Sequence, residues 1–351
     1  MITNQEAVNR VIRQVIEELE KECEGQGSES TGLYDTVEEA VQNAVEAQKR
    51  LISMTLESRR KIIEAIRKVT LDNNETLSAL SVRETKMGRY EDKIRENILC
   101  ATKTPGVEDI QPQALSGDHG LMLLEFAPVG VIGSLTPITN PTGTLIHNAI
   151  SMTAAGNAVI FNAHPNAKET SAQVIKLFHG AIVQAGGPPG LISSVRQPTL
   201  ATAKEIIEHP KINMLVATGG RPVVNTVLRS GKKAVGAGAG NPPALVDETA
   251  HIRKAAQCII NGASINNNLF CTSEKEVLVV EEVASSLIKF MQETGKAYLL
   301  NRKEAERVTN LVVTPQRQIN GAYIGKDVQV ILKEIGIEVG EECRLAIFEA
   351  P

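Results

Sequence analysis

Tryptophan is absent from the 351-residue sequence, and aromatic residues make up only 3% of it. The core must therefore be built from Val, Ile, Leu and Ala, as is usual for parallel sheets buried under helices. Hydrophobic residues make up 42% and charged residues 22%, ordinary values that exclude disorder as the default. The composition favours an α/β fold, with two domains or one large unit.

A charge excess, a long apolar run and clustered metal ligands are also missing. The net charge of -4 gives no electrostatic reason to expect nucleic acid or an anionic membrane as a partner. No apolar run approaches the roughly 20 residues of a membrane span, and the N-terminus lacks a signal-peptide pattern. The six histidines show no HExxH or other ligand spacing. We therefore expect a cytoplasmic protein without a metal site.

The five cysteines are scattered and never form a CxxC pair, which excludes a disulfide framework and a thiolate zinc site. One of them, Cys271, lies in NNNLFCTSEK. Three asparagines and two apolar residues, Leu269 and Phe270, precede it, and a charged segment follows it. It lacks the continuous apolar flanks of a core residue. From the residues alone it is one of five candidate nucleophiles, and a free buried thiol is the commoner fate. The candidates are Cys23, Cys100, Cys258, Cys271 and Cys343.

The N-terminal residues 1–22 predict an amphipathic helix with a single apolar stripe. A Gly/Ser/Glu-rich stretch follows and predicts a flexible linker over residues 23–35. The helix could dock on its own domain, but the linker favours docking on a separate partner. The stripe consists of Val8, Val11, Ile12, Val15, Ile16 and Leu19.

The remainder of the chain predicts an α/β fold. Residues 36–99 have apolar positions at helical spacing, and after residue 121 short β-branched runs alternate with helical segments. This alternation indicates βαβ units that form a parallel sheet. Residues 345–348 are expected to form a buried strand.

Gly219 and Gly220 form a turn that leads from a predicted strand into a predicted helix. Free N–H groups and the positive end of the helix dipole make such a turn suitable for a phosphate, although many glycine turns bind no ligand. The nearby VGAGAGNPP at residues 235–243 is not a dinucleotide fingerprint, because Asn241 stands where the last glycine of GxGxxG belongs.

Five ordered segments together resemble the CoA-acylating branch of the aldehyde dehydrogenase superfamily. They are APVGVIGSLTPITNPTGT, AAGNAVIFNAHPNAKET, HPKINMLVATGG, SGKKAVGAGAGNPPALVDETA and NNNLFCTSEK. The resemblance covers about residues 36–350 and is closest to the propionaldehyde and acetaldehyde dehydrogenases of bacterial microcompartments. The N-terminal helix and linker are similar to the encapsulation peptides of such enzymes.

The resemblance implies that Cys271 is the catalytic nucleophile, which forms an acyl thioester with an aldehyde after hydride transfer. It also implies that the Asn140 side chain and the Cys271 backbone N–H stabilise the oxyanion. An asparagine before Pro141 is alternatively a common turn residue. Hydrolytic relatives activate water with a glutamate in an ELGG motif, and the matching GAGAGN contains no glutamate.

NAD is the implied cofactor and CoA the implied co-substrate. For His164 a capping or turn role is an equal alternative to cofactor binding. The resemblance implies a Rossmann-type nicotinamide cofactor domain at residues 36–238 and an α/β catalytic domain at residues 239–351. Relatives extend beyond the last residue, so this catalytic domain is expected to be C-terminally truncated. The resemblance also implies an oligomerisation hairpin near residues 108–128. The implied cofactor-binding residues are Thr136, Pro137, His164, Pro165, Thr218, Gly219, Gly220, Gly236 and Gly238.

The resemblance thus implies an NAD-dependent oxidoreductase that converts a short aldehyde such as propionaldehyde or acetaldehyde, with CoA, to acyl-CoA. The alternative is a catalytically inactive truncated paralogue or fragment that serves as microcompartment cargo or assembly protein. We expect a homo-oligomer inside a bacterial microcompartment, with a shell protein bound to the N-terminal helix. We expect no membrane or nucleic acid among its partners.

Overall fold

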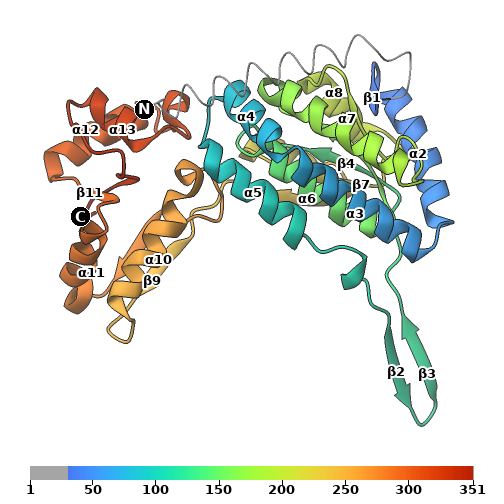
Figure 1. Cartoon of the computed structure of the whole chain (residues 1–351), viewed down its shortest axis with the longest axis horizontal. Helices are drawn as coiled ribbons and strands as arrows, with labels where there is room; N and C mark the ends of the chain where they lie inside the picture. Colours follow the sequence, from blue (N-terminus) through green and yellow to red (C-terminus); the bar gives the residue numbers. More distant parts are fainter. Residues whose placement is uncertain (1–30, 351) are drawn as a thin grey trace. The chain divides into compact units, whose positions relative to one another are not determined.

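A computed structural model describes residues 31–350, which form two compact units (Figure 1). Unit 1 comprises residues 31–85 and 93–238, and unit 2 comprises residues 86–92 and 239–350. The helix predicted over residues 1–22 and the first part of the predicted linker lie outside the described residues. The predicted end of the linker at residue 35 is wrong, because Leu33 and Tyr34 form strand β1 and pair with a neighbouring strand.

Unit 1 is built on a parallel sheet whose six described strands run in the order β1-β6-β5-β4-β7-β8. The central strands β4 and β5 are buried along their whole length, which fits their Val- and Ile-rich sequences. The mixed α/β fold with a parallel sheet is therefore confirmed. The strands are β1 (Leu33–Tyr34), β4 (Val131–Leu135), β5 (Ala158–Asn162), β6 (Ile192–Val195), β7 (Met214–Thr218) and β8 (Lys233–Ala237).

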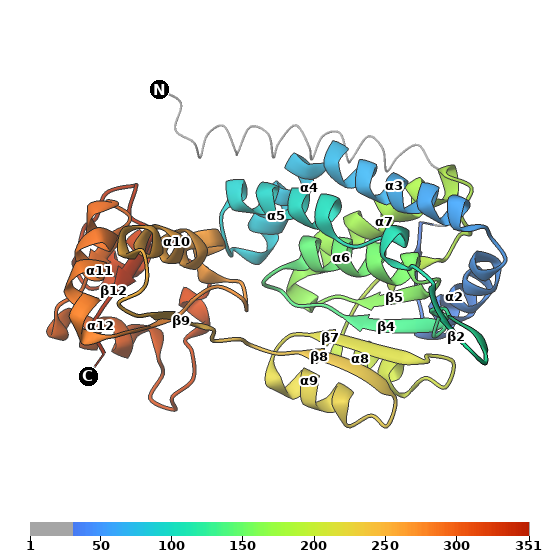
Figure 2. The same cartoon turned by 90° about the horizontal axis from the view of Figure 1, so that it is seen from below.

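Helices cover both faces of this sheet (Figure 2). One face carries α6 (Pro141–Ala154) and α7 (Lys168–Gln184), with α3 (Leu56–Asp72) packed on them. The other face carries α2 (Val37–Ile52), α8 (Leu200–Glu208) and α9 (Arg221–Leu228). Helix α4 (Asn74–Thr85) packs on α7, and α5 (Tyr90–Lys103) follows it in the chain. The helices predicted from apolar periodicity in this region are confirmed.

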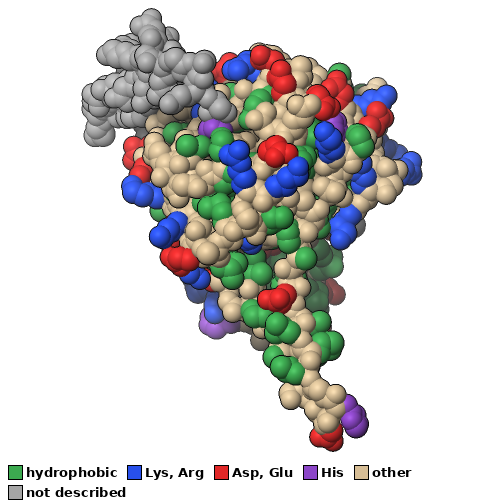
Figure 3. Space-filling view, turned by 90° about the vertical axis from the view of Figure 1, so that its right-hand side faces the viewer, with side chains coloured by type: hydrophobic (Ala, Val, Ile, Leu, Met, Phe, Trp, Pro, Cys, Tyr) green, Lys and Arg blue, Asp and Glu red, His purple; other side chains and the backbone are tan. Residues whose placement is uncertain are grey.

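A β-hairpin extends from unit 1 between α5 and β4 (Figure 1). It pairs β2 (Gln113–Gly117) with β3 (Gly120–Leu124) in antiparallel register, with Leu115 opposite Met122. Its apolar side chains are exposed and gather along the projection in Figure 3, and Leu121 and Phe126 are more than 70% exposed. This hairpin therefore presents apolar surface to its surroundings.

Unit 2 contains two small parallel sheets and two apolar clusters. The expectation of a buried strand over residues 345–348 is wrong in part, because β12 is only half-buried and Phe348 is 50% exposed. The strands are β9 (Pro243–Val246) with β10 (Glu276–Val279), and β11 (Ala297–Leu299) with β12 (Leu345–Ile347); the helices are α10 (Ile252–Ser264), α11 (Glu281–Glu293), α12 (Arg302–Val312) and α13 (Val328–Glu334).

Among residues 31–350, no helix combines the length and the apolar character needed to cross a membrane. The same residues contain no group of three or more His, Cys, Asp or Glu side chains placed to hold a metal ion.

Candidate active site

The carboxyl edge of the unit 1 sheet brings most of the predicted cofactor residues together. Thr136 and Pro137 follow β4, His164 and Pro165 follow β5, and Gly219 and Gly220 follow β7. From β4 the chain winds outward through β5 and β6, and then it returns to β7 on the other side of β4. In open α/β sheets, ligands bind at the strand ends where the winding direction reverses. The edge between β4 and β7 is that place.

Strands β4, β5, β6 and β7 lead into helices α6, α7, α8 and α9. In the first three of these helices, side chains cap the N-terminal N–H groups. Asn140 caps α6, the Glu84 carboxylate accepts hydrogen bonds from the N–H groups of Glu169 and Thr170 in α7, and Thr199 forms a capping box at α8. Helix α9 begins after Gly220 without a side-chain cap. Its N–H groups and dipole are therefore the ones available to a phosphate at this edge.

The glycines of this edge have two different roles. A Cβ atom on Gly219 would meet nothing within 4 Å, and one on Gly220 would meet only Pro222 at 3.7 Å, so both backbones are open to a ligand. A Cβ on Gly236 would lie 2.7 Å from Cγ1 of Val224, so this glycine lets α9 pack closely on β8. Gly238 follows the end of β8 and also faces open space.

Two further side chains test whether the edge fits a nicotinamide dinucleotide. Thr136 is 6% exposed, and its buried Oγ1 has no hydrogen-bond partner among the described residues. A buried hydroxyl without a partner is destabilising, so a ligand that supplies one is favoured. The ring of His164 accepts a hydrogen bond from the Asn166 N–H at 3.2 Å, which is the capping role, and burial lowers its pKa. The orphan hydroxyl and the uncapped helix α9 fit the cofactor.

Asn140 is held in a conformation that suits a hydrogen-bond donor. Its Oδ1 accepts the Gly143 N–H at 3.1 Å, so the amide oxygen faces the helix and the Nδ2 group remains available to donate. A Cβ atom on Gly143 would lie 2.7 Å from both Asn140 Oδ1 and Glu96 Oε1. Glycine at this position is therefore required for the close approach of both side chains.

In unit 2, the asparagine run builds the loop that carries Cys271. Asn266, Asn267 and Asn268 all adopt left-handed backbone conformations, with φ of 51°, 55° and 59°. Asparagine tolerates this region better than other residues with a side chain, but three in succession need external support. These three residues therefore determine the backbone geometry of the loop.

Each asparagine of the run is anchored by hydrogen bonds within unit 2. The Asn266 N–H donates to Asp92 Oδ2 at 2.9 Å, and its own Oδ1 accepts the Arg89 N–H at 3.0 Å. Asn267 Oδ1 accepts a hydrogen bond from Arg89 Nε at 2.9 Å. Asn268 Nδ2 donates to the carbonyl groups of Ala263 and Glu274 at 2.8 and 3.0 Å. The loop is thus fixed on both sides of the cysteine.

Cys271 is exposed at the end of this anchored loop. A Cβ atom on Gly240 would lie 2.1 Å from the Cys271 carbonyl oxygen, so only glycine allows the two backbones to approach. The Lys275 ammonium donates to the carbonyl groups of Phe270 and Ser273 at 2.8 and 3.0 Å. Burial lowers the pKa of Lys275, and the nearby Cys271 opposes this effect. The loop therefore holds the Lys275 ammonium against the carbonyl groups of residues on both sides of Cys271.

The other cysteines of the described part are less suited to nucleophilic attack. Burial raises the pKa of Cys100 to about 12 and also raises the pKa of Cys343. Cys258 is exposed but lies on the regular helix α10. Of the two predicted catalytic residues, Cys271 belongs to unit 2 and Asn140 to unit 1.

Sequence reasoning missed the residues that support these groups. Glu84, Lys93 and Glu96 lie on predicted helices, where no spacing distinguishes them from solvated charges. The three consecutive asparagines were a usable signal for left-handed backbone. Gly240 lies in a glycine-rich segment whose pattern does not point to Cys271, because the close approach of the two residues depends on tertiary structure.

Comparisons with known proteins identify the relatives of this chain. A model of the aldehyde dehydrogenase family matches residues 14–329. An acetaldehyde dehydrogenase (acetylating) from Bilophila wadsworthia is 44% identical over 327 residues, which cover 91% of this chain and 67% of the relative.

Two solved structures are similar over most of the chain. The propionaldehyde dehydrogenase from the Clostridium phytofermentans fucose utilisation bacterial microcompartment has a TM-score of 0.88 and 47% identity, covering 91% of this chain and 73% of that one. Rhodopseudomonas palustris propionaldehyde dehydrogenase, with bound CoA and an acylated cysteine, has a TM-score of 0.89 and 40% identity, covering 92% and 74%. The chain spans about two thirds to three quarters of these proteins, and it belongs to the aldehyde dehydrogenase family.

Proposed function

We propose that this protein converts a short-chain aldehyde, CoA and NAD to acyl-CoA and NADH through a thioester on Cys271. The observation that carries the proposal is the presentation of this thiol. It is exposed on a loop that three left-handed asparagines and the close approach of Gly240 hold in place. The relatives named above are acylating or propionaldehyde dehydrogenases, which gives the aldehyde class.

The first step is addition of the thiolate to the aldehyde. The Cys271 sulfur bonds to the carbonyl carbon, and the electron pair of the broken C=O π bond moves to the oxygen. We assign stabilisation of this oxyanion to Asn140 Nδ2 and the Cys271 backbone N–H. Loss of one such donor typically slows acyl transfer by about 10²- to 10³-fold.

The second step leaves an acyl thioester on the enzyme. NAD supplies the acceptor for the hydride that leaves the hemithioacetal carbon. We assign its phosphates to the uncapped N-terminus of α9 at Gly219 and Gly220, and one polar contact to the orphan hydroxyl of Thr136. These groups bind and orient the cofactor.

The final step is transfer of the acyl group to CoA rather than to water. The segment GAGAGN at residues 236–241 offers only Gly, Ala and Asn side chains, none of which can act as a base for water at neutral pH. The acyl-enzyme therefore persists until the CoA thiolate attacks the thioester carbon. The Cys271 thiolate leaves, and acyl-CoA is released.

The direct test is NADH formation by the purified chain from propionaldehyde, NAD and CoA. We expect CoA-dependent turnover, its loss in Cys271→Ala, and its retention in the matched control Cys258→Ala, which removes the other exposed described cysteine. Folded protein without CoA-dependent NADH formation would instead support a cargo or assembly role.

Two partner surfaces belong to the same proposal. The apolar stripe that the sequence predicts for residues 1–22 supports docking on a microcompartment shell protein, and deletion of residues 1–20 should abolish co-purification with shells while the rest of the protein folds. Unchanged packaging of the deletion variant would refute the docking role. The exposed apolar side chains of Leu121 and Leu123 in the β2–β3 hairpin, and of Phe126 just after it, support contact with a second copy.

A further inference from the structure

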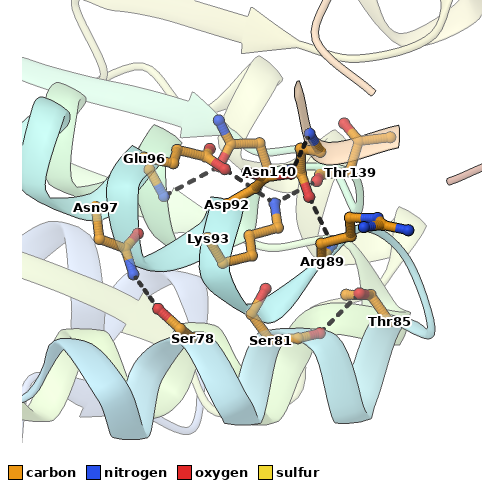
Figure 4. A network of polar contacts seen from close by, with 12 residues as sticks. Ser78, Ser81, Thr85, Arg89, Asp92, Lys93, Glu96, Asn97, Thr139 and Asn140 are labelled. Atoms are coloured by element: carbon orange, nitrogen blue, oxygen red, sulfur yellow. Dashed lines mark hydrogen bonds and ion pairs between the residues drawn. The ribbon is translucent and has the colours of Figure 1, made fainter. Parts of the chain in front are cut away.

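Lys93 on α5 is among the largest fully buried side chains of the described residues, with 0% exposure. Lysine is almost never fully buried unless it is paired, because desolvating its charge is expensive. Its burial within unit 1 therefore requires an explanation in its contacts. Figure 4 shows these contacts, with the Lys93 side chain directed toward Glu96 and Thr139.

The Lys93 ammonium joins two groups next to Asn140. Its Nζ donates to the Thr139 carbonyl oxygen at 2.9 Å and forms an ion pair with Glu96 Oε2 at 3.2 Å. Thr139 directly precedes Asn140 in the chain. The first contact therefore fixes the peptide unit that enters the cap of α6.

Glu96 lies close to the Gly143 backbone in the same turn. Its side chain is 4% exposed, and its Oε1 lies where a Cβ atom on Gly143 would be only 2.7 Å away. A carboxylate near a helix N-terminus is favoured by the helix dipole. Lys93 and Glu96 thus contact the turn of residues 139–143 at Thr139 and at Gly143, on either side of Asn140 in the sequence.

The helix that carries the pair is itself fixed by buried polar contacts. Asn97 Nδ2 donates to Asn74 Oδ1 at 3.0 Å and to Ser78 Oγ at 3.1 Å, which ties α5 to α4. These three residues are buried. These two hydrogen bonds are shielded from water, so they hold α5, and with it the Lys93 backbone, against α4.

We propose that Lys93 and Glu96 are positioning residues that direct Asn140 Nδ2 toward the oxyanion. The proposal rests on the oxyanion role given above to Asn140. The mechanism is indirect: Lys93 fixes the Thr139 carbonyl group, and Glu96, which is ion-paired with Lys93, packs against Gly143, whose N–H donates to Asn140 Oδ1. Neither side chain touches the reacting atoms.

The test uses the double variant Lys93→Met/Glu96→Gln, which removes both charges and leaves no unpaired charge in the core. The matched control is Lys103→Met, an exposed lysine on the same helix. We expect the double variant to lower kcat by about 10- to 100-fold, because small misplacements of catalytic groups have effects of this size. The KM for NAD and the rate of Cys271 alkylation by iodoacetamide should not change, and the control should resemble the wild type.

Asn140→Ala provides the decisive background. If the pair acts through Asn140, adding Lys93→Met/Glu96→Gln to Asn140→Ala should lower kcat by less than about 2-fold. The same factor in both backgrounds would overturn the proposal, since the pair would then act elsewhere.

A second readout is independent of turnover. Hydrogen exchange of the Gly143 amide should be faster in the double variant than in the wild type and in Lys103→Met, because the Asn140 Oδ1 bond loosens. Unchanged exchange of this amide would contradict the positioning role even if the wild-type chain formed no NADH. Failure of the proposed function and failure of this inference are therefore distinguishable.

Discussion

Replacing Gly240 with Ala tests how strictly the Cys271 loop must be placed. The added Cβ atom would lie 2.1 Å from the Cys271 carbonyl oxygen, and relieving the overlap to 3.0 Å takes a displacement of about 0.9 Å, the difference between the two distances. Because the contact is with backbone, no side-chain rotation can relieve it. A shift of this size in a reacting group costs about 100-fold in rate, so we expect kcat to fall by that factor.

The assay is CoA-dependent NADH formation, with the thermal unfolding midpoint measured on the same samples. Gly340→Ala is the matched control in unit 2, because a Cβ atom there would meet nothing within 4 Å. Overpacking costs about 1–3 kcal/mol of stability, so Gly240→Ala should still be folded at 25 °C. Wild-type kcat in folded Gly240→Ala protein would refute the idea that Gly240 fixes the nucleophile.

Three other outcomes follow from the described contacts. Thr136→Val, which removes a buried hydroxyl without a described partner, should weaken NAD binding about 5-fold in a calorimetric titration without lowering the unfolding midpoint; unchanged affinity would exclude a cofactor contact. Glu84→Gln removes the charged cap that accepts the Thr170 N–H at 2.7 Å, and it should destabilise the fold by about 1–2 kcal/mol in urea titration; an unchanged midpoint would contradict this. At pH 8 iodoacetamide should label Cys271 well before Cys100, because burial raises the pKa of Cys100 to about 12 and its thiol stays protonated; equal labelling rates would show that Cys100 is not buried. Unfolding returns the Cys100 pKa to its ordinary value of 9.0, so its contribution to stability is present below pH 9 and is lost as the pH rises toward 12.

Periodicity in the sequence was sufficient for the central part of unit 1. The alternation of β-branched runs with amphipathic segments predicts β4 to β7 and the helices between them, because each element buries one face or both in a single core. The edge strands β1 and β8 were not predicted, because they are short or largely exposed. The candidate cofactor residues came from the family resemblance, and the parallel arrangement explains why those after β4, β5 and β7 lie at one edge.

The supporting residues could not be predicted in this way, because their roles arise from contacts distant in sequence. Lys93 and Thr139 are 46 positions apart, and Glu84 and Thr170 are 86 positions apart. On a helix, a charged residue that pairs inside the protein has the same local pattern as one in solvent. The strand at residues 345–347 was predicted from its apolar sequence, but its half-buried state depends on what packs beside it.

The most direct measurement is mass spectrometry of the intact chain after incubation with propionaldehyde and NAD, first without CoA and then with it. We expect a propanoyl adduct on the peptide that contains Cys271, stable in buffer and removed by CoA with formation of propanoyl-CoA. A folded chain that never carries the adduct, or one that loses it equally fast without CoA, would refute the thioester mechanism.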